Sequence, residues 1–181
     1  MVAFPQPVVG VDGRKYLPFF SSKCCFSNFF PQKFTQDGVE YSSSEQYFQH
    51  QKALTFGDHQ TAAWIMLTDK PKEARYLGRR VHGFDPVVWE QKSMDVMYKG
   101  VRAKFIESDY LEFTLIAYHK DAIPVECNPS DHLWSCGLKI DDPRVLDPKQ
   151  WLGLNRLGQV IMKVRKELDE FWIDAMSGAP Y

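Results

Sequence analysis

The strongest periodic signal in the chain lies near its end, where apolar residues recur on one helix face. The series consists of Leu157, Val160, Ile161, Val164, Leu168 and Phe171. This i, i+3, i+4, i+7 spacing predicts an amphipathic helix with one side to bury. Of the 181 residues, 44% are hydrophobic, and a chain of about 150 residues can bury roughly 70% of its unfolded surface. We therefore expect a substantial core, which excludes a disordered chain or a small disulfide scaffold.

The rest of the chain predicts further helices and a few short strands. Helices are expected over residues 45–54, 60–68, 72–77, 86–105 and 110–118. Strands are expected over 15–20 and 123–127, and a hairpin over 34–41 turns at Asp37-Gly38. No repeat or long Gly/Ser linker interrupts the chain. The prediction is a compact α+β fold, predominantly helical, forming a single domain over residues 1–181.

Charge and cysteine usage narrow the function classes. The 22 Lys and Arg residues nearly balance the 23 Asp and Glu residues, so we expect neither a general DNA-binding patch nor attraction to an anionic membrane. The cysteines Cys24, Cys25, Cys127 and Cys136 are too sparse for a disulfide framework and are interpreted as reduced thiols. With no signal peptide or apolar span in the sequence, we expect a soluble cytoplasmic protein; a nuclear location is equally compatible.

Several familiar catalytic motifs are absent from the sequence. It has no Walker loop, no Gly-x-Gly-x-x-Gly, no His-Glu-x-x-His and no paired Cys-x-x-Cys, which disfavours P-loop hydrolysis, Rossmann redox chemistry and zinc-finger folding. Cys127, His132 and Cys136 lie close in sequence, but their spacing matches no common zinc pattern and a fourth ligand is missing. We predict no metal site.

Glu45 has two interpretations. It lies three positions after Ser42, so its carboxylate fits a capping box at a helix start. Glu45, Gln49 and Lys52 also share a helix face, and about 10 Å separates the first from the last along the axis. That span could hold a sugar between an acid and a phosphate-binding cation.

A second group of residues has ordinary structural roles by default. Asp131 fits a turn carboxylate in the Pro-Ser-Asp sequence. Trp134 and Trp89 are typical core aromatics, and Lys104 near a predicted helix end is a typical solvated cation. Two carboxylates and two indoles also suit a site for a planar, sugar-bearing ligand.

An ordered set of short motifs resembles the NADAR family of YbiA-like N-glycosidases over about residues 19–168. The opening motifs are Phe26-Ser27-Asn28-Phe29-Phe30-Pro31 and Asp37-Gly38-Val39-Glu40-Tyr41-Ser42-Ser43-Ser44-Glu45-Gln46-Tyr47-Phe48-Gln49 with Lys52. The later ones are Trp89-Glu90, Val96-Met97, Ala103-Lys104-Phe105, Val125-Glu126, Asp131-x-x-Trp134, Gly153-Leu154-Asn155-Arg156-Leu157-Gly158 and Ile161-Met162-Lys163-Val164-Arg165.

The resemblance implies a mainly helical YbiA-like fold and hydrolysis of an N-glycosidic bond. The implied substrates are ribosylamino-pyrimidine phosphates of riboflavin synthesis, or ADP-ribose attached to guanine in a nucleotide or nucleic acid. The implied catalytic residues are Glu45, Asp131, Trp89 and Trp134, and the implied substrate-binding residues are Asn28, Lys52, Lys104 and Asn155. No cofactor and no metal are implied. In such chemistry Glu45 would act as general base or stabilise the sugar cation, with Asp131 as its positioning partner.

One position departs from the family pattern. Members commonly have Trp-Gly-x-Gly where this chain has Trp134-Ser135-Cys136-Gly137. If the glycine has positive φ or lets a ligand approach closely, Ser135 would strain the loop or narrow the pocket. The alternative function is therefore a non-catalytic module that binds ADP-ribose or a ribosyl phosphate.

Overall fold

The structure is a computed structural model that describes residues 5–118 and 120–177. Its α-helices are α1 (Ser44–Thr55), α2 (His59–Met66), α3 (Pro71–Gly78), α4 (Pro86–Ile106), α5 (Asp109–Ala117) and α6 (Arg156–Ser177). Its strands are β1 (Val8–Val9), β2 (Lys15–Phe19), β3 (Phe34–Gln36), β4 (Val39–Tyr41) and β5 (Ala122–Glu126), and two short 3-10 helices are η1 (Pro143–Leu146) and η2 (Pro148–Gln150). The predicted α+β class with helix dominant is confirmed.

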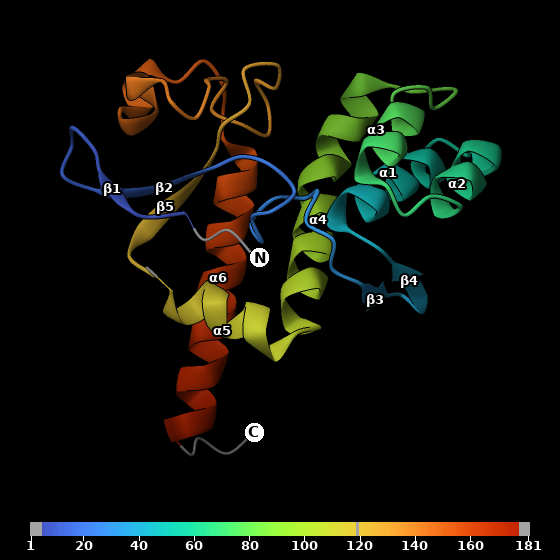
Figure 1. The fold of residues 1–181 in the computed structure, drawn as a ribbon. Coiled ribbons are helices and arrows are strands. Elements are labelled where there is room, and N and C mark those ends of the chain that lie inside the picture. Colours follow the sequence, from blue (N-terminus) through green and yellow to red (C-terminus); the bar gives the residue numbers. More distant parts are fainter. Residues whose placement is uncertain (1–4, 119, 178–181) are drawn as a thin grey trace.

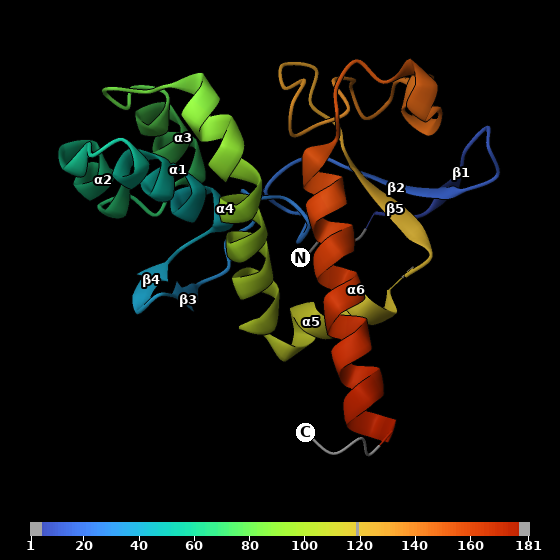
Figure 2. The same ribbon diagram turned by 180° about the vertical axis from the view of Figure 1, so that it is seen from behind.

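Two long helices form the centre of the molecule. Figure 1 shows α4 and α6 running side by side, with α1, α2 and α3 beyond α4 and the three-stranded sheet beyond α6. The reverse view in Figure 2 gives the same arrangement and places α5 beside the lower part of α6. The main core fills this space with buried residues of both helices, including Met97, Val101 and Phe105 of α4 and Ile161, Val164 and Leu168 of α6. The apolar series predicted for α6 therefore marks its buried face, except for Phe171, which is 50% exposed.

The larger sheet joins distant parts of the chain in the order β1-β2-β5. β1 and β2 are antiparallel, whereas β2 and β5 are parallel, with Lys15 opposite Ala122 and Phe19 opposite Glu126. A parallel pair needs a long crossover, and here the helices α1–α5 supply it. This pairing places the carboxyl end of β5 beside the loop that follows β2.

Local sequence signals account for several element boundaries. The side chain of Asp85 accepts hydrogen bonds from the amides of Val87 and Val88 and Pro86 occupies the first turn, so α4 begins where predicted. β3 and β4 form the predicted hairpin, with positive φ at Asp37 and Gly38. The strand β1 and the two 3-10 helices were not predicted. The four cysteines are buried and unbridged, as expected for reduced thiols.

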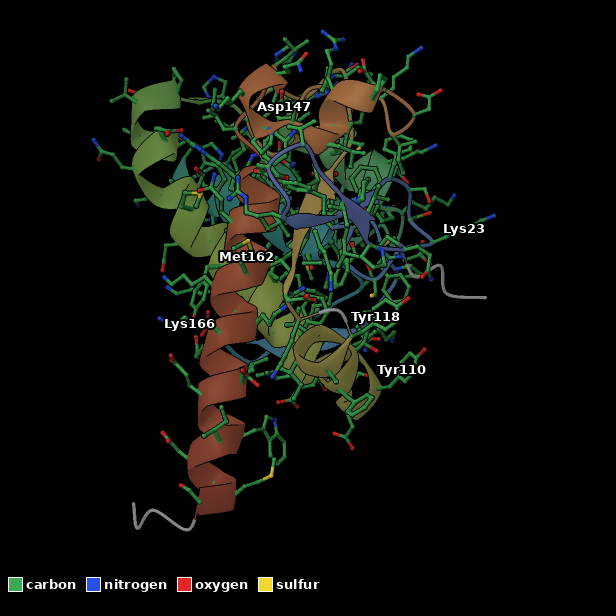
Figure 3. The ribbon with its side chains drawn as sticks, turned by 90° about the vertical axis from the view of Figure 1, so that its left-hand side faces the viewer. Lys23, Tyr110, Tyr118, Asp147, Met162 and Lys166 are labelled. Atoms are coloured by element: carbon green, nitrogen blue, oxygen red, sulfur yellow. The ribbon has the colours of Figure 1, made fainter. Side chains whose placement is uncertain are left out.

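The end of α6 projects past the other elements. Figure 3 shows this helix extending beyond α5, with Lys166 on its outer side. Among the described residues, no helix combines the length and the apolar character that crossing a membrane requires.

Candidate functional site

One cavity of about 190 Å³ gathers polar and aromatic side chains from several segments, and we call it the inner cavity. Its carboxylates are Glu45, Glu126 and Asp131, and its cations are Lys52, Arg75 and Arg79. The remaining lining residues are Asn28, Phe29, Phe48, Gln49, Trp89, Met97 and Trp134. All four predicted catalytic residues and two predicted substrate-binding residues, Asn28 and Lys52, therefore line one cavity.

A second cavity of about 540 Å³ adjoins the first, and we call it the outer cavity. The two cavities share Phe29, Arg75, Arg79 and Glu126. The outer cavity adds Phe20, Ser21, Ser22, Ser27, Lys72, Tyr76 and Asn128. The shared residues make the two cavities parts of one continuous site.

Glu45 lies at the first turn of α1 and is only 6% exposed. Its backbone N–H donates to the carbonyl of Asn28, and its Oε1 accepts a 2.8 Å hydrogen bond from Nε2 of Gln49. Burial raises the pKa of Glu45; the hydrogen bond from Gln49 and the charge of Arg75 oppose this shift, and the charge of Asp131 adds to it. A carboxyl with a raised pKa is better suited to accept a proton near neutral pH than an ordinary glutamate.

The capping interpretation of Glu45 is wrong. The N-cap of α1 is Ser43, whose Oγ accepts from the amide of Gln46. The Gln46 side chain reaches back and accepts from the backbone N–H of Ser42 through its Oε1. The capping pair is thus Ser43 and Gln46, one residue later than predicted. The carboxyl of Glu45 takes no part in capping and lines the inner cavity.

The predicted helix face of Glu45, Gln49 and Lys52 lines the inner cavity as a unit. Nζ of Lys52 donates to the carbonyl of Gly78 over 2.9 Å and lies 4.0 Å from the centre of the Phe84 ring. Burial lowers the pKa of Lys52, as does the charge of Arg79, while Glu45 opposes the shift. One end of this face therefore carries an acid and the other a cation.

Asp131 accepts hydrogen bonds within its turn and also lines the inner cavity. Its Oδ1 accepts from the amides of Leu133 and Trp134, at 3.1 and 2.8 Å, which is the default turn role. Its Oδ2 lies 3.5 Å from Nη2 of Arg75. Two backbone amides thus fix the Asp131 carboxylate at the cavity wall, and the Arg75 guanidinium forms an ion pair with it.

The aromatic wall consists of three rings. Phe48 lies edge-on to Trp89 at 5.1 Å and to Trp134 at 5.3 Å between ring centres. Trp89 is also part of the main core, whereas Trp134 is half-buried and packs against that core. Both the core role and the cavity role apply to Trp89, and the three rings offer an apolar surface to a planar ligand.

Sequence reasoning missed the cations that α3 brings to the site. Lys72, Arg75, Tyr76 and Arg79 are spaced i, i+3, i+4, i+7, so they share one helix face, and all of them line the outer cavity. The sequence predicts only a helix over residues 72–77. This spacing of cations is the signal that could have found them.

Lys104 and Asn155 line neither of these two cavities, and their role in substrate binding stays a prediction. Lys104 is fully buried, and its Nζ donates to the carbonyls of Cys25 and Ser27 at 2.8 and 3.3 Å. The side chain of Asn155 donates to the carbonyl of Pro124 and accepts from the amide of Glu126. Both side chains support the backbone next to the site.

Lys104→Met tests this supporting role. Burial lowers the pKa of Lys104 from an ordinary 10.5 to about 8, so the unfolded chain binds more protons than the folded one between these values. Stability should rise with pH across this window in the wild type, by up to about 3 kcal/mol, and this rise should be absent from Lys104→Met. Denaturant melts from pH 7.5 to 10.5 measure the difference. Equal pH slopes, or lost ligand affinity in folded Lys104→Met, would contradict the assignment.

Ser135 neither strains the loop nor narrows the pocket, which corrects both expectations. It is not among the described residues with positive φ, and it lines neither cavity. Its hydroxyl lies 2.8 Å from the carbonyl of Glu126 and accepts from the amide of Asn128 over 2.7 Å. Ser135 therefore ties the loop to the end of β5.

Within residues 5–118 and 120–177, no group of three or more His, Cys, Asp or Glu side chains is arranged to hold a metal ion. Cys127 and Cys136 are buried, and Nδ1 of His132 pairs with the carbonyl of Leu152 at 2.9 Å. The absence of a catalytic metal stays a prediction.

Comparisons with known proteins agree on one family. The model of the NADAR domain matches residues 18–169. The chain is 37% identical to the N-glycosidase R617 of Acanthamoeba polyphaga mimivirus, over 78% of this chain and 86% of that protein. It is 34% identical to protein irg-1 of Caenorhabditis elegans, over 86% of this chain and 80% of that protein.

A solved structure shares the fold. The NMR structure of the E. coli protein YbiA superposes with a TM-score of 0.72 at 30% identity, covering 88% of each chain. The chain belongs to the NADAR domain family and has the YbiA-like fold, as the resemblance implied.

Proposed function

We propose that this protein is an N-glycosidase that hydrolyses the C–N bond between a base and a phosphorylated ribose or ADP-ribose. The observation that carries the proposal is the buried Glu45 carboxyl, which faces one cavity with Asp131, two indoles and three cations. The similarity to the N-glycosidase R617 of mimivirus supports the reaction type.

The carboxylates suit the charge that develops in the reaction. Breaking a glycosidic C–N bond gives the sugar oxocarbenium character, which a nearby carboxylate stabilises. Glu45 is placed to accept a proton from the attacking water or to stabilise this cation. Asp131, held by two backbone amides and paired with Arg75, would position the sugar or the water.

The cations suit a phosphorylated sugar. Lys52 lies at the end of the Glu45 helix face, and Arg75 and Arg79 line both cavities. Arginine binds phosphate oxygens through two parallel donors. The inner cavity is smaller than the roughly 300–1,000 Å³ of typical ligand sites, whereas the outer cavity of about 540 Å³ falls within that range. A sugar in the inner cavity with phosphates or a nucleotide in the outer cavity fits these sizes.

Trp134, Phe48 and Trp89 suit the base. Indole faces stack on planar heterocycles, and a wall of rings keeps water from the sugar and strengthens each charge in the site. The alternative, a binding module without turnover, rested on Ser135 obstructing the pocket. Since Ser135 lines neither cavity, the hydrolase is favoured.

The test is base release followed by mass spectrometry. The purified protein is incubated with a ribosylamino-pyrimidine phosphate and, separately, with an ADP-ribosylated guanosine nucleotide. We expect a free base together with ribose 5-phosphate or ADP-ribose, at an unchanged rate after treatment with a metal chelator. Binding of either compound in a titration, without release of its base, would instead identify a binding module.

A further inference from the structure

Glu126 stands at the boundary between the two cavities. It is the last residue of β5 and pairs with Phe19 of β2. Its side chain lines both the inner and the outer cavity. A ligand that occupies both cavities must therefore pass along this carboxyl.

Both backbone polar groups of Glu126, its N–H and its C=O, are hydrogen-bonded. Its N–H donates to Oδ1 of Asn155 over 3.1 Å, and its carbonyl accepts from the Cys136 amide at 2.9 Å and from the Ser135 hydroxyl at 2.8 Å. The carboxyl thus projects from a rigid point rather than from a mobile loop. Such support is what a group needs in order to act at a defined atom of a ligand.

The carboxyl of Glu126 differs from those of Glu45 and Asp131 in its hydrogen bonding. Glu45 accepts from Gln49, and Asp131 accepts from two backbone amides and faces Arg75. Among the described residues, no hydrogen bond or ion pair reaches the carboxyl of Glu126 within ordinary distance. Its oxygens are therefore available to a ligand.

The surroundings of Glu126 favour the neutral acid. Burial raises the pKa of Glu126 to about 8; the charges of Asp131 and Glu45 add to the shift, and Arg75 opposes it. The titratable and charged groups that face it are Glu45 of α1, Arg75 and Arg79 at the end of α3, Lys104 of α4, and Cys127, Asp131 and Cys136 after β5. The half-buried carboxyl of Glu126, at the boundary of the two cavities, therefore keeps its proton to a higher pH than an ordinary glutamate does.

We propose that Glu126 is the general acid that protonates the departing base, in the reaction stated under the proposed function, on which this inference rests. As the C1′–N bond breaks, its electron pair goes to the base, and a nitrogen of the base takes the proton of Glu126. Water adds to C1′ and gives its proton to Glu45. Proton exchange with solvent then restores both carboxyls, so that one water is consumed and no other reactant is needed.

Glu126→Gln is the decisive variant. We expect its rate of base release at pH 7 to fall by roughly 10²-fold or more, the usual contribution of a positioned proton donor. The wild-type kcat/KM should decline as the pH rises through about 8, where Glu126 loses its proton, and this decline should be absent from the variant. Glu107→Gln, which removes an exposed carboxylate outside both cavities, should keep the wild-type rate and profile.

A second readout does not depend on turnover. Because the folded-state pKa of Glu126 lies above its ordinary 4.5, the folded protein should lose stability as the pH rises from about 4.5 to 8. Melting temperatures of Glu126→Gln should fall less over this range than those of the wild type. An active wild type whose rate and pH profile survive in Glu126→Gln would overturn the acid role alone. A wild type that releases no base would overturn the proposed function and this role together.

Discussion

Replacing Glu45 by glutamine should abolish base release while the protein stays folded. A general base contributes roughly 10²–10⁴-fold to a rate, and an amide can neither accept the proton nor stabilise a sugar cation by charge. The Gln49 hydrogen bond can persist, because the new amide oxygen still accepts it. Single-turnover base release at pH 7, with ligand affinity measured in parallel, should show intact binding and lost chemistry.

Stability provides an internal check on the same variant. Burial raises the pKa of Glu45, so ionising it costs the folded state stability as the pH rises above its ordinary 4.5. Glu45→Gln should therefore lose less stability than the wild type as the pH rises above about 4.5. The matched control is Ser43→Ala, which removes the actual cap of α1 and should cost about 0.5–2 kcal/mol with turnover per folded molecule unchanged. Near-normal turnover in folded Glu45→Gln would remove the catalytic assignment.

The capping register shows where local sequence patterns stop being informative. Three consecutive serines, Ser42 to Ser44, precede the helix, and each of the first two has a plausible capping partner three residues later. The choice falls on Ser43 because Gln46 also donates from its Nε2 to the carbonyls of Ile65 and Thr68. These contacts join α1 to the end of α2, and no local pattern contains them.

Hydrogen bonds to distant backbone segments also determine where the side chains of Lys104 and Asn155 lie. Helical periodicity near a helix end favours a solvated lysine, yet Lys104 is buried against carbonyls of the segment at Cys25 and Ser27. Asn155 adopts a positive φ of 47°, and its side chain hydrogen-bonds to the carbonyl of Pro124 and the amide of Glu126 on β5. Both side chains hydrogen-bond to backbone next to the site. A family motif alone cannot distinguish such supporting contacts from contact with a ligand.

The position of Glu126 likewise depends on a long-range contact, the parallel pairing of β2 with β5. Each strand was predicted from its own sequence, but their pairing spans more than a hundred residues. Only that pairing brings Glu126 beside Arg75 of α3 and Glu45 of α1. The sequence marks Glu126 only as part of the Val125-Glu126 motif, and its place at the boundary of the two cavities is visible only in the fold.

Truncating Trp89 to alanine should damage both stability and ligand binding. Trp89 is only 8% exposed and packs in the main core beside Phe48, so its removal should cost about 3–5 kcal/mol of unfolding free energy. Its ring also lines the inner cavity, and lost stacking on a base, worth roughly 1–3 kcal/mol, should weaken affinity about tenfold to a hundredfold.

Trp134→Ala separates the two effects, because Trp134 lines the same cavity but is half-buried. We expect a similar loss of affinity with a smaller loss of stability. Trp64, which is 49% exposed on α2 and outside both cavities, supplies the matched truncation: Trp64→Ala should change neither quantity much. Denaturant melts and ligand titrations of the three variants measure this pattern. Unchanged affinity in the folded fraction of Trp89→Ala would leave Trp89 a core residue only, and the base would then have to stack on Phe48 or Trp134.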